Sequence, residues 1–158
     1  MEVTPHIVSI VYTPAGDYDR PVERYLRVPI SSADLVAGRG IRGDRKGSNS
    51  NRALNLMSAE TLAVLANEGF KTSPGQMGEQ IVIAGLDFSS LIEGTRLQLG
   101  DAAVIEFVQD RTGCERFERI QGKSPSTVAG RLGFMACVIT GGHIAAGDAV
   151  RVYTHASN

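Results

Sequence analysis

The stretch TRLQLGDAAVIEFV, residues 95–108, indicates the class of fold most clearly. Two runs rich in apolar residues, 95–99 and 102–108, flank the pair Gly100-Asp101. A glycine beside an aspartate between such runs is a common signal for a tight hairpin. We therefore expect two adjacent antiparallel strands in this stretch.

The same pattern of strand, turn and strand recurs on both sides of this hairpin. Downstream, residues 134–140 and 148–153 are strand-like, and Gly141-Gly142 follows the first of them as a turn. Upstream, we expect strands at residues 6–12, 52–57 and 80–84 and find a weaker strand pattern at 24–30. Many short strands with one or two helices predict a mainly β fold, either a partly closed β-barrel or a β-rich α+β domain.

One helix is expected among these strands, over residues 59–68. Ser58 is a favourable N-cap, Met57 and Leu62 are spaced as a hydrophobic staple, and Gly69 occupies the position where helices often end. Its buried stripe should consist of Leu62, Leu65 and Ala66.

Length and composition favour a single globular domain over residues 1–158, with a core from about 6 to 153. The 158 residues are 42% hydrophobic and 21% charged, which is close to ordinary globular usage. A net charge of −1 gives no overall field that attracts nucleic acid or anionic lipid. Because the sequence shows no signal-peptide pattern, no run of about 20 apolar residues and only two cysteines, we expect a cytoplasmic protein with no membrane or nucleic-acid partner.

The first candidate for chemistry is Cys114, within the stretch RTGCERF at residues 111–117. It follows a predicted strand and precedes a short helix expected over 115–120, so the helix dipole and the nearby Arg111 favour the thiolate. A thiolate binds soft metals or accepts a persulfide sulfur. Gly113 should allow a sharp turn and leave space beside the sulfur. The alternative is that Cys114 is a small buried apolar residue.

Cys137 differs, because it lies in the apolar run 134–139 and is expected in the core. The two cysteines and His143 lack the close spacing of zinc ligands.

A glycine-rich basic segment, residues 38–52, is the second candidate. It holds five basic side chains and a single acid, Asp44; the basic residues are Arg39, Arg42, Arg45, Lys46 and Arg52. Glycine-rich backbone and arginine side chains together can hold a phosphate, whereas the alternative is a mobile, solvated loop. The stretch contains no Walker lysine-serine pair and no dinucleotide fingerprint.

The third candidate is the stretch PGQMGEQ at residues 74–80, which predicts a tight turn before a strand. Taken alone, it is a turn in which Glu79 is an exposed acid.

In this order and spacing the three segments resemble the MOSC domain, the C-terminal module of molybdenum-cofactor sulfurases. That family also includes stand-alone bacterial proteins and the amidoxime-reducing component. Residues 40–45 look like its glycine-aspartate signature, residues 52–56 like the strand that follows, and residues 74–87 like its Pro-Gly…Gly-Glu-Asn…Gly-Leu-Asp stretch. Residues 93–100 and 141–148 match later hairpins, so the resemblance covers about 6–153. The chain differs where Gln80 replaces an asparagine, where Gly113 replaces a proline, and where Lys46-Gly47 replaces a histidine.

The resemblance implies a MOSC-type β-barrel with a few short helices and a pterin-bound molybdenum (molybdopterin) held by Cys114, which would be both metal ligand and catalytic residue. Arg45, Arg52 and Arg111 would hold the pterin and its phosphate. The remaining cofactor-binding positions implied are Gly43, Asp44, Glu79 and Gln80.

Members of the family reduce N-hydroxylated compounds or carry sulfur on the cysteine. The expected function is therefore a molybdenum-dependent oxidoreductase that needs a separate electron-transfer protein. The alternative is a persulfide carrier that receives sulfur from a desulfurase without redox catalysis.

A glycine in place of proline at position 113 should loosen the loop that carries Cys114.

Overall fold

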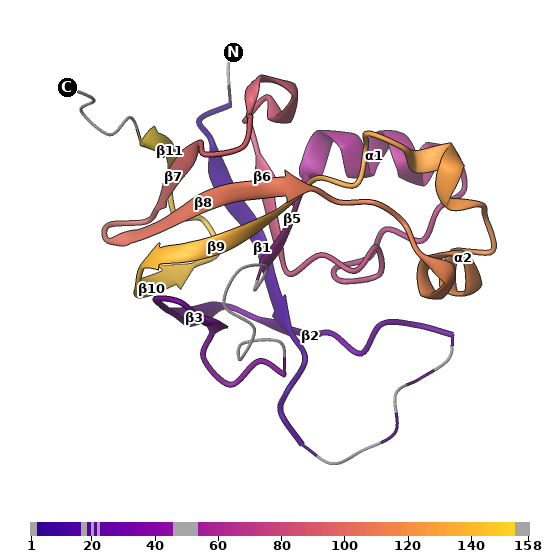
Figure 1. Cartoon of the computed structure of the whole chain (residues 1–158), viewed down its shortest axis with the longest axis horizontal. Coiled ribbons are helices and arrows are strands. Elements are labelled where there is room, and N and C mark those ends of the chain that lie inside the picture. Colours follow the sequence, from indigo (N-terminus) through magenta and orange to yellow (C-terminus); the bar gives the residue numbers. More distant parts are fainter. Residues whose placement is uncertain (1–2, 17–18, 20, 22, 46–53, 154–158) are drawn as a thin grey trace.

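The computed structural model describes residues 3–16, 19, 21, 23–45 and 54–153. Within them the strands are β1 (His6–Tyr12), β2 (Val28–Ile30), β3 (Ser32–Val36), β4 (Gly40–Ile41), β5 (Leu54–Ser58), β6 (Ile81–Ala84), β7 (Arg96–Leu99), β8 (Ala103–Asp110), β9 (Phe134–Thr140), β10 (Gly142–Ala145) and β11 (Val150–Tyr153). The two α-helices are α1 (Ala59–Asn67) and α2 (Glu115–Gln121), and short 3₁₀ turns lie at Phe88–Ser90 and Pro125–Val128. Both α-helices lie beyond the same end of the strands (Figure 1).

Eight strands form one sheet in the order β11-β7-β8-β9-β5-β6-β1-β2, and β10, β3 and β4 form a second, small sheet. All pairs are antiparallel except β5 and β6. A parallel pair needs a crossover connection, and α1 lies in the segment that connects β5 to β6. The predicted hairpin is confirmed, because Leu99 pairs with Ala103 across the Gly100-Asp101 turn.

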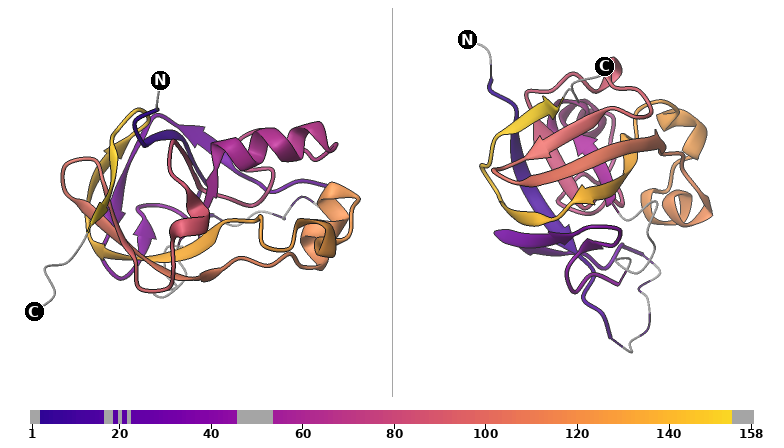
Figure 2. Two further views of the ribbon diagram at one scale, coloured as in Figure 1. Left: turned by 90° about the horizontal axis from the view of Figure 1, so that it is seen from above. Right: turned by 60° about the vertical axis from the view of Figure 1, so that its left-hand side comes forward.

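The large sheet curves strongly, as both views in Figure 2 show. Near its two ends, the first residues of β1 meet the turn before β11. His6 forms a bridge with Ala149, the Ile7 N–H donates to Asp148 O at 2.9 Å, and the Gly147 N–H donates to Ile7 O at 2.7 Å. Within the described residues this is a local bridge and not a closed ladder of strands. The expectation of a mainly β fold with a few short helices is confirmed.

Helix α1 has the predicted N-cap. The Thr61 N–H donates to Ser58 Oγ at 3.3 Å, and Gly69 adopts φ +92° just beyond the helix. Leu62 and Leu65 are buried as expected, but Ala66 is exposed, so the buried stripe is narrower than predicted. No helix in the described part of the chain is long and apolar enough to cross a bilayer.

The core has two parts. One fills the inside of the curved sheet and is made by apolar side chains of β1, β5 to β9 and β11, with Leu35, Ile41 and Ile144 from the small sheet. The other joins both helices to one face of the sheet and contains Met57, Leu65, Met77, Val82 and Phe117. This second cluster fixes α2, and therefore the residues just before it, against the turn that precedes β6.

Candidate functional site

The turn at residues 75–79 is built around a buried carboxylate. Glu79 is fully buried, and its carboxylate accepts hydrogen bonds from the Gly75 N–H at 2.8 Å and the Met77 N–H at 3.1 Å. Burial raises the pKa of Glu79, although these N–H groups and the Arg111 charge oppose the shift. The interpretation of Glu79 as an exposed acid is therefore wrong, because its side chain folds back onto its own turn.

The carbonyl groups of this turn hold two arginines. Arg111 Nη2 donates to Met77 O at 2.9 Å, and Arg27 Nη2 donates to Gly78 O at 3.0 Å. Burial lowers the pKa of both guanidinium groups, but the ordinary pKa of arginine is so high that both remain cationic. The turn therefore fixes two partly or fully buried positive charges beside each other.

Gly78 makes the close approach of these groups possible. Its φ is +88°, and a Cβ at this position would lie 2.7 Å from Arg111 Nη2 and 3.1 Å from Tyr25 Cζ. A side chain there would have to displace the guanidinium. The glycine is thus required both by its backbone conformation and by the groups packed against it.

Asp44 and Gln80 are brought together as a buried support for the site. Asp44 Oδ1 accepts from the Thr13 N–H and its Oδ2 accepts from Gln80 Nε2, each at 2.8 Å. Gln80 Oε1 in turn accepts from the Asn55 N–H at 2.7 Å. In this structure Gln80 thus links the Asp44 loop to β5.

Gly43 and Arg45, on either side of Asp44, join the basic loop to the residues after β1. Gly43 O accepts from the Ala15 N–H at 3.1 Å, and the Arg45 N–H donates to Thr13 O at 2.7 Å. Arg52 lies outside the described residues, so its predicted role remains a prediction.

Cys114 is the N-cap residue of α2, as expected, and it is exposed. Its backbone carbonyl accepts from the Glu118 N–H at 3.0 Å. The helix is held by Gln121, whose Nε2 donates to the carbonyls of Lys71 and Gln76, each at 2.9 Å. The alternative of a buried Cys114 is excluded by its exposure.

Gly113 lies against Pro125. A Cβ at this position would lie 2.6 Å from Pro125 Cβ, and its φ is not positive. The resemblance leads us to expect a proline before Cys114, but the chain has Gly113 there. A different proline, Pro125, packs against this glycine. The loosening predicted for this loop is opposed by that contact.

A pocket of about 330 Å³ lies where the residues around Tyr25, the turn at Gly78 and the residues around Cys114 meet. Its lining includes Cys114 and four arginines: Arg27, Arg45, Arg111 and Arg116. The described residues that line it include no aspartate or glutamate. An exposed thiol and four guanidinium groups, in a lining without aspartate or glutamate, make a pocket suited to an anion that coordinates sulfur.

Tyr25 lies close to two of the pocket arginines. The Arg116 Cζ lies 5.3 Å from the Tyr25 ring centroid and the Arg27 Cζ lies 5.9 Å from it. Burial raises the pKa of the Tyr25 hydroxyl, so it remains protonated at neutral pH. The tyrosine can therefore donate a hydrogen bond to a pocket ligand.

Of the residues predicted for the site, Arg45, Arg111 and Cys114 line the pocket together, whereas Gly43, Asp44, Glu79 and Gln80 are not among the described residues that line it. Sequence reasoning missed Tyr25, Arg27, Asn55 and Arg116 as pocket residues. Arg116 was visible in the cysteine motif. Tyr25 and Arg27 lie in the weak strand pattern at 24–30, which gave no sign that they meet Gly78.

Cys137 is only half-buried, so the prediction that it lies in the core is wrong. It pairs with Glu106 across β8 and β9, on the face of the sheet opposite the core. Burial, with the Glu106 charge, raises the pKa of the Cys137 thiol. The Cys137 thiol thus lies beside a carboxylate, whereas the Cys114 thiol lies at a pocket lined by arginines.

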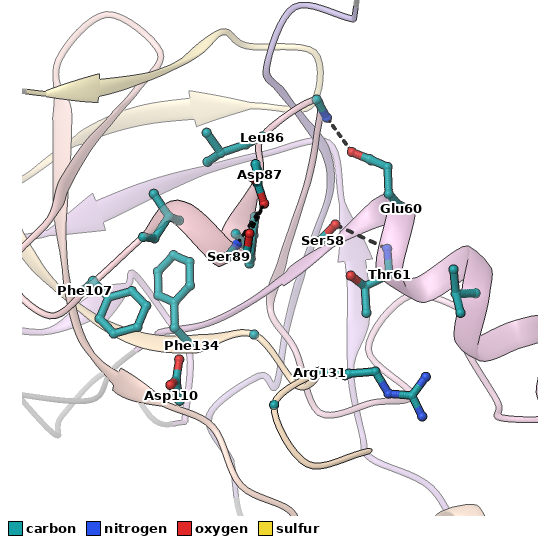
Figure 3. Close-up of a pocket in the computed structure, with 16 residues that line it drawn as sticks. Ser58, Glu60, Thr61, Leu86, Asp87, Ser89, Phe107, Asp110, Arg131 and Phe134 are labelled. Atoms are coloured by element: carbon teal, nitrogen blue, oxygen red, sulfur yellow. Dashed lines mark hydrogen bonds between the residues drawn. The ribbon is translucent and has the colours of Figure 1, made fainter. Parts of the chain in front are cut away.

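A larger pocket of about 620 Å³ lies elsewhere, between α1, the 3₁₀ turn at 88–90 and the start of β9. Figure 3 shows the rings of Phe107 and Phe134 on one side of it, with a centroid separation of 4.7 Å. Its single arginine, Arg131, forms a two-pronged ion pair with Glu68 at 2.7 and 2.9 Å. It contains none of the predicted site residues, and its acidic side chains, Glu60, Asp87 and Asp110, do not suit an anion.

Comparison with solved structures finds close agreement in fold. YiiM from Escherichia coli superposes with a TM-score of 0.71 at 21% identity, over 97% of this chain and 72% of that one. YuaD from Bacillus subtilis gives a TM-score of 0.76 at 18% identity, over 96% and 98%. YiiM from Geobacillus stearothermophilus gives 0.74 at 16%, over 95% and 75%.

No curated protein matches the chain by sequence. The family model of the MOSC domain matches residues 42–151, which is more than half of the chain and includes Cys114 and most of the basic segment 38–52. The chain belongs to the MOSC domain family.

Proposed function

We propose that this protein binds the molybdenum cofactor in the arginine-lined pocket and uses it to reduce N-hydroxylated compounds, with Cys114 as the molybdenum ligand. The observation that carries the proposal is the position of Cys114, an exposed thiol at a pocket lined by four arginines and no acid. Soft thiolate sulfur suits molybdenum, and the guanidinium groups suit the phosphate and the other negative charges of the cofactor.

The residues present fit such a group. Arg111 and Arg27 are already held by backbone carbonyls and need no rearrangement to present their charge. Gly78 allows Arg111 and Tyr25 to pack against the turn, where a Cβ would displace them. Arg27 Nε–H is a buried donor without a hydrogen-bond partner among the described residues.

When bound, the cofactor would supply two-electron redox chemistry, and a separate protein would supply the electrons. Removal of an N-hydroxyl group as water also consumes two protons. Tyr25, which burial keeps protonated, is placed to donate one of them to the departing oxygen. Arg116 would hold the Tyr25 ring in place through its contact with that ring.

Metal and pterin analysis tests the proposal. Protein from a host that makes the cofactor should contain close to one molybdenum per chain and release a fluorescent oxidised pterin. Cys114→Ser should lose the molybdenum, whereas the matched variant Cys137→Ser should keep it. Wild type without molybdenum and without pterin would refute the proposal.

A second function is favoured by the exposure of Cys114, which a partner protein could reach directly. In a carrier role, the Cys114 thiolate would attack the outer sulfur of a desulfurase persulfide, and the desulfurase cysteine would leave as a thiolate. The intact mass should then rise by one sulfur atom on exposure to a cysteine desulfurase and fall on reduction. An adduct that persists in Cys114→Ser would exclude this role.

Both functions assign the protein to a reducing compartment, and we propose the cytoplasm. Two free cysteines in the described structure agree with that location. The proposed partners are a small-molecule substrate or sulfur donor and a redox or desulfurase protein, without nucleic acid or membrane.

A further inference from the structure

Asn55, on β5, presents a buried acceptor in the wall of the arginine-lined pocket. Only 4% of the residue is exposed, and its Oδ1 has no hydrogen-bond partner among the described residues. A buried acceptor without a partner costs free energy, so such atoms are rare and need an explanation.

The orientation of the Asn55 amide is fixed by its other half. Nδ2 lies 3.3 Å from Gly78 O and donates to it. If the amide were reversed, an oxygen would face that carbonyl oxygen, which is unfavourable. The unpartnered atom is therefore the oxygen, and it requires a donor.

Arg27 supplies the complementary feature. Its Nη2 donates to the same Gly78 carbonyl at 3.0 Å, so the Asn55 and Arg27 side chains converge on a single atom. The Arg27 Nε–H is also buried and unpartnered among the described residues. One unpaired acceptor and one unpaired donor thus lie in the same part of the pocket wall.

We propose that Asn55 and Arg27 form a specificity subsite for a ligand edge that carries an N–H beside a carbonyl, as in the lactam of a pyrimidinone or pterin ring. Asn55 Oδ1 accepts from the ligand N–H, and Arg27 Nε donates to the ligand carbonyl. The pocket then selects an anion that also has a lactam edge, and it discriminates against simple oxyanions and aromatic acids. This inference rests on the proposed function, because it names the part of the bound ligand that is recognised.

The two atoms are covered in the present conformation. A ligand reaches them by displacing a side chain of the pocket wall, a local change that commonly accompanies binding. The binding energy then includes the removal of two unsatisfied groups, so the loss on deleting one of them should be measurable.

Two probes of similar size separate lactam recognition from anion binding. Pterin-6-carboxylate carries a lactam edge and a carboxylate, whereas 2-naphthoate is a two-ring carboxylate without N–H or O–H donors. Calorimetry would use protein from a host that lacks the molybdenum-cofactor pathway. Wild type should bind pterin-6-carboxylate roughly tenfold or more tightly than 2-naphthoate, because one well-made buried hydrogen bond is worth about that factor.

The variant Asn55→Ala should lose roughly tenfold in affinity for pterin-6-carboxylate and keep its affinity for 2-naphthoate within about twofold. Asn67→Ala, on the exposed end of α1, is the matched control and should bind both probes as wild type does. The wild-type comparison needs no variant, so the proposal remains testable if Asn55→Ala does not fold. Equal wild-type affinities, no binding of either probe, or equal losses for both probes in Asn55→Ala would overturn it.

Failure of the proposed function gives a different result. If wild type from a cofactor-making host contains no molybdenum but still distinguishes the two probes through Asn55, the lactam subsite stands and the molybdenum function fails. If that protein contains molybdenum and pterin but Asn55→Ala binds both probes as wild type does, the subsite alone is refuted.

Discussion

Replacing Gly78 with alanine should damage both the stability of the protein and its anion pocket. Gly78 has φ +88°, and the new Cβ would lie 2.7 Å from Arg111 Nη2 and 3.1 Å from Tyr25 Cζ. Gly94 provides a matched control, because its φ is +90° and a Cβ there would meet nothing within 4 Å. The two alanine variants therefore share the backbone penalty and differ in the contacts.

The expected magnitudes follow from these contacts. A side chain in left-handed backbone costs roughly 1–2 kcal/mol, which is the whole effect expected for Gly94→Ala. In Gly78→Ala the Arg111 guanidinium must also move away from Met77 O, which it now contacts at 2.9 Å. A hydrogen bond from a charged group contributes about 1.5–3 kcal/mol, so Gly78→Ala should lose roughly 3–5 kcal/mol in total.

Urea denaturation would give the free energy of unfolding of both variants, and calorimetry with inorganic phosphate would report on the pocket. Gly78→Ala should bind phosphate about tenfold more weakly than wild type, and Gly94→Ala should bind it equally well. If both variants lose the same stability and bind phosphate as wild type does, Gly78 does not act by making room for Arg111.

Three further predictions concern the supporting residues. Burial raises the pKa of Glu79, so the folded chain holds this proton more tightly than the unfolded chain, and the stability due to Glu79 falls as pH rises from about 4.5 toward neutrality. In urea titrations Glu79→Gln should therefore gain stability relative to wild type over this range, and a difference that does not change with pH would contradict the reasoning. Gln121→Ala removes a side chain that also accepts from the Lys71 N–H at 2.8 Å, and it should lower the free energy of unfolding by about 2–4 kcal/mol and speed hydrogen exchange in α2. Unchanged exchange in α2 would show that Gln121 does not hold the helix. Because burial raises the pKa of Cys137, its alkylation by iodoacetamide in Cys114→Ser at neutral pH should be slower than that of free cysteine, and an equal rate would show that its thiol is unperturbed.

The sequence predicted the elements whose signals are local. The hairpin of β7 and β8, the caps of α1 and the helix after Cys114 each depend on residues close together in the chain. The pairing of β10 with β3 was missed because the two strands lie far apart in the sequence, as His143 and its partner Asp34 do. Gly142 in particular was interpreted as a turn, but it begins β10.

The candidate site, like the fold, could be predicted from the sequence only where its residues belong to local motifs. The three motifs predicted an anion site near a cysteine, and they do bring Arg45, Arg111 and Cys114 to one pocket. Arg27 could not be assigned to it, because it reaches Gly78 across 51 residues of chain. Cys137 was misplaced because an unbroken apolar run hides the alternation of a strand, in which successive side chains point to opposite faces.

The most direct test of the central claim is the alkylation of Cys114 with and without bound cofactor. Protein isolated from a cofactor-making host, and the same protein after removal of the cofactor, would be labelled with iodoacetamide and followed by peptide mass spectrometry. Cys114 should be protected in the first sample and labelled in the second, while the half-buried Cys137 reacts equally in both. If Cys114 is labelled at the same rate in the two samples, its thiol is not the group that holds the ligand.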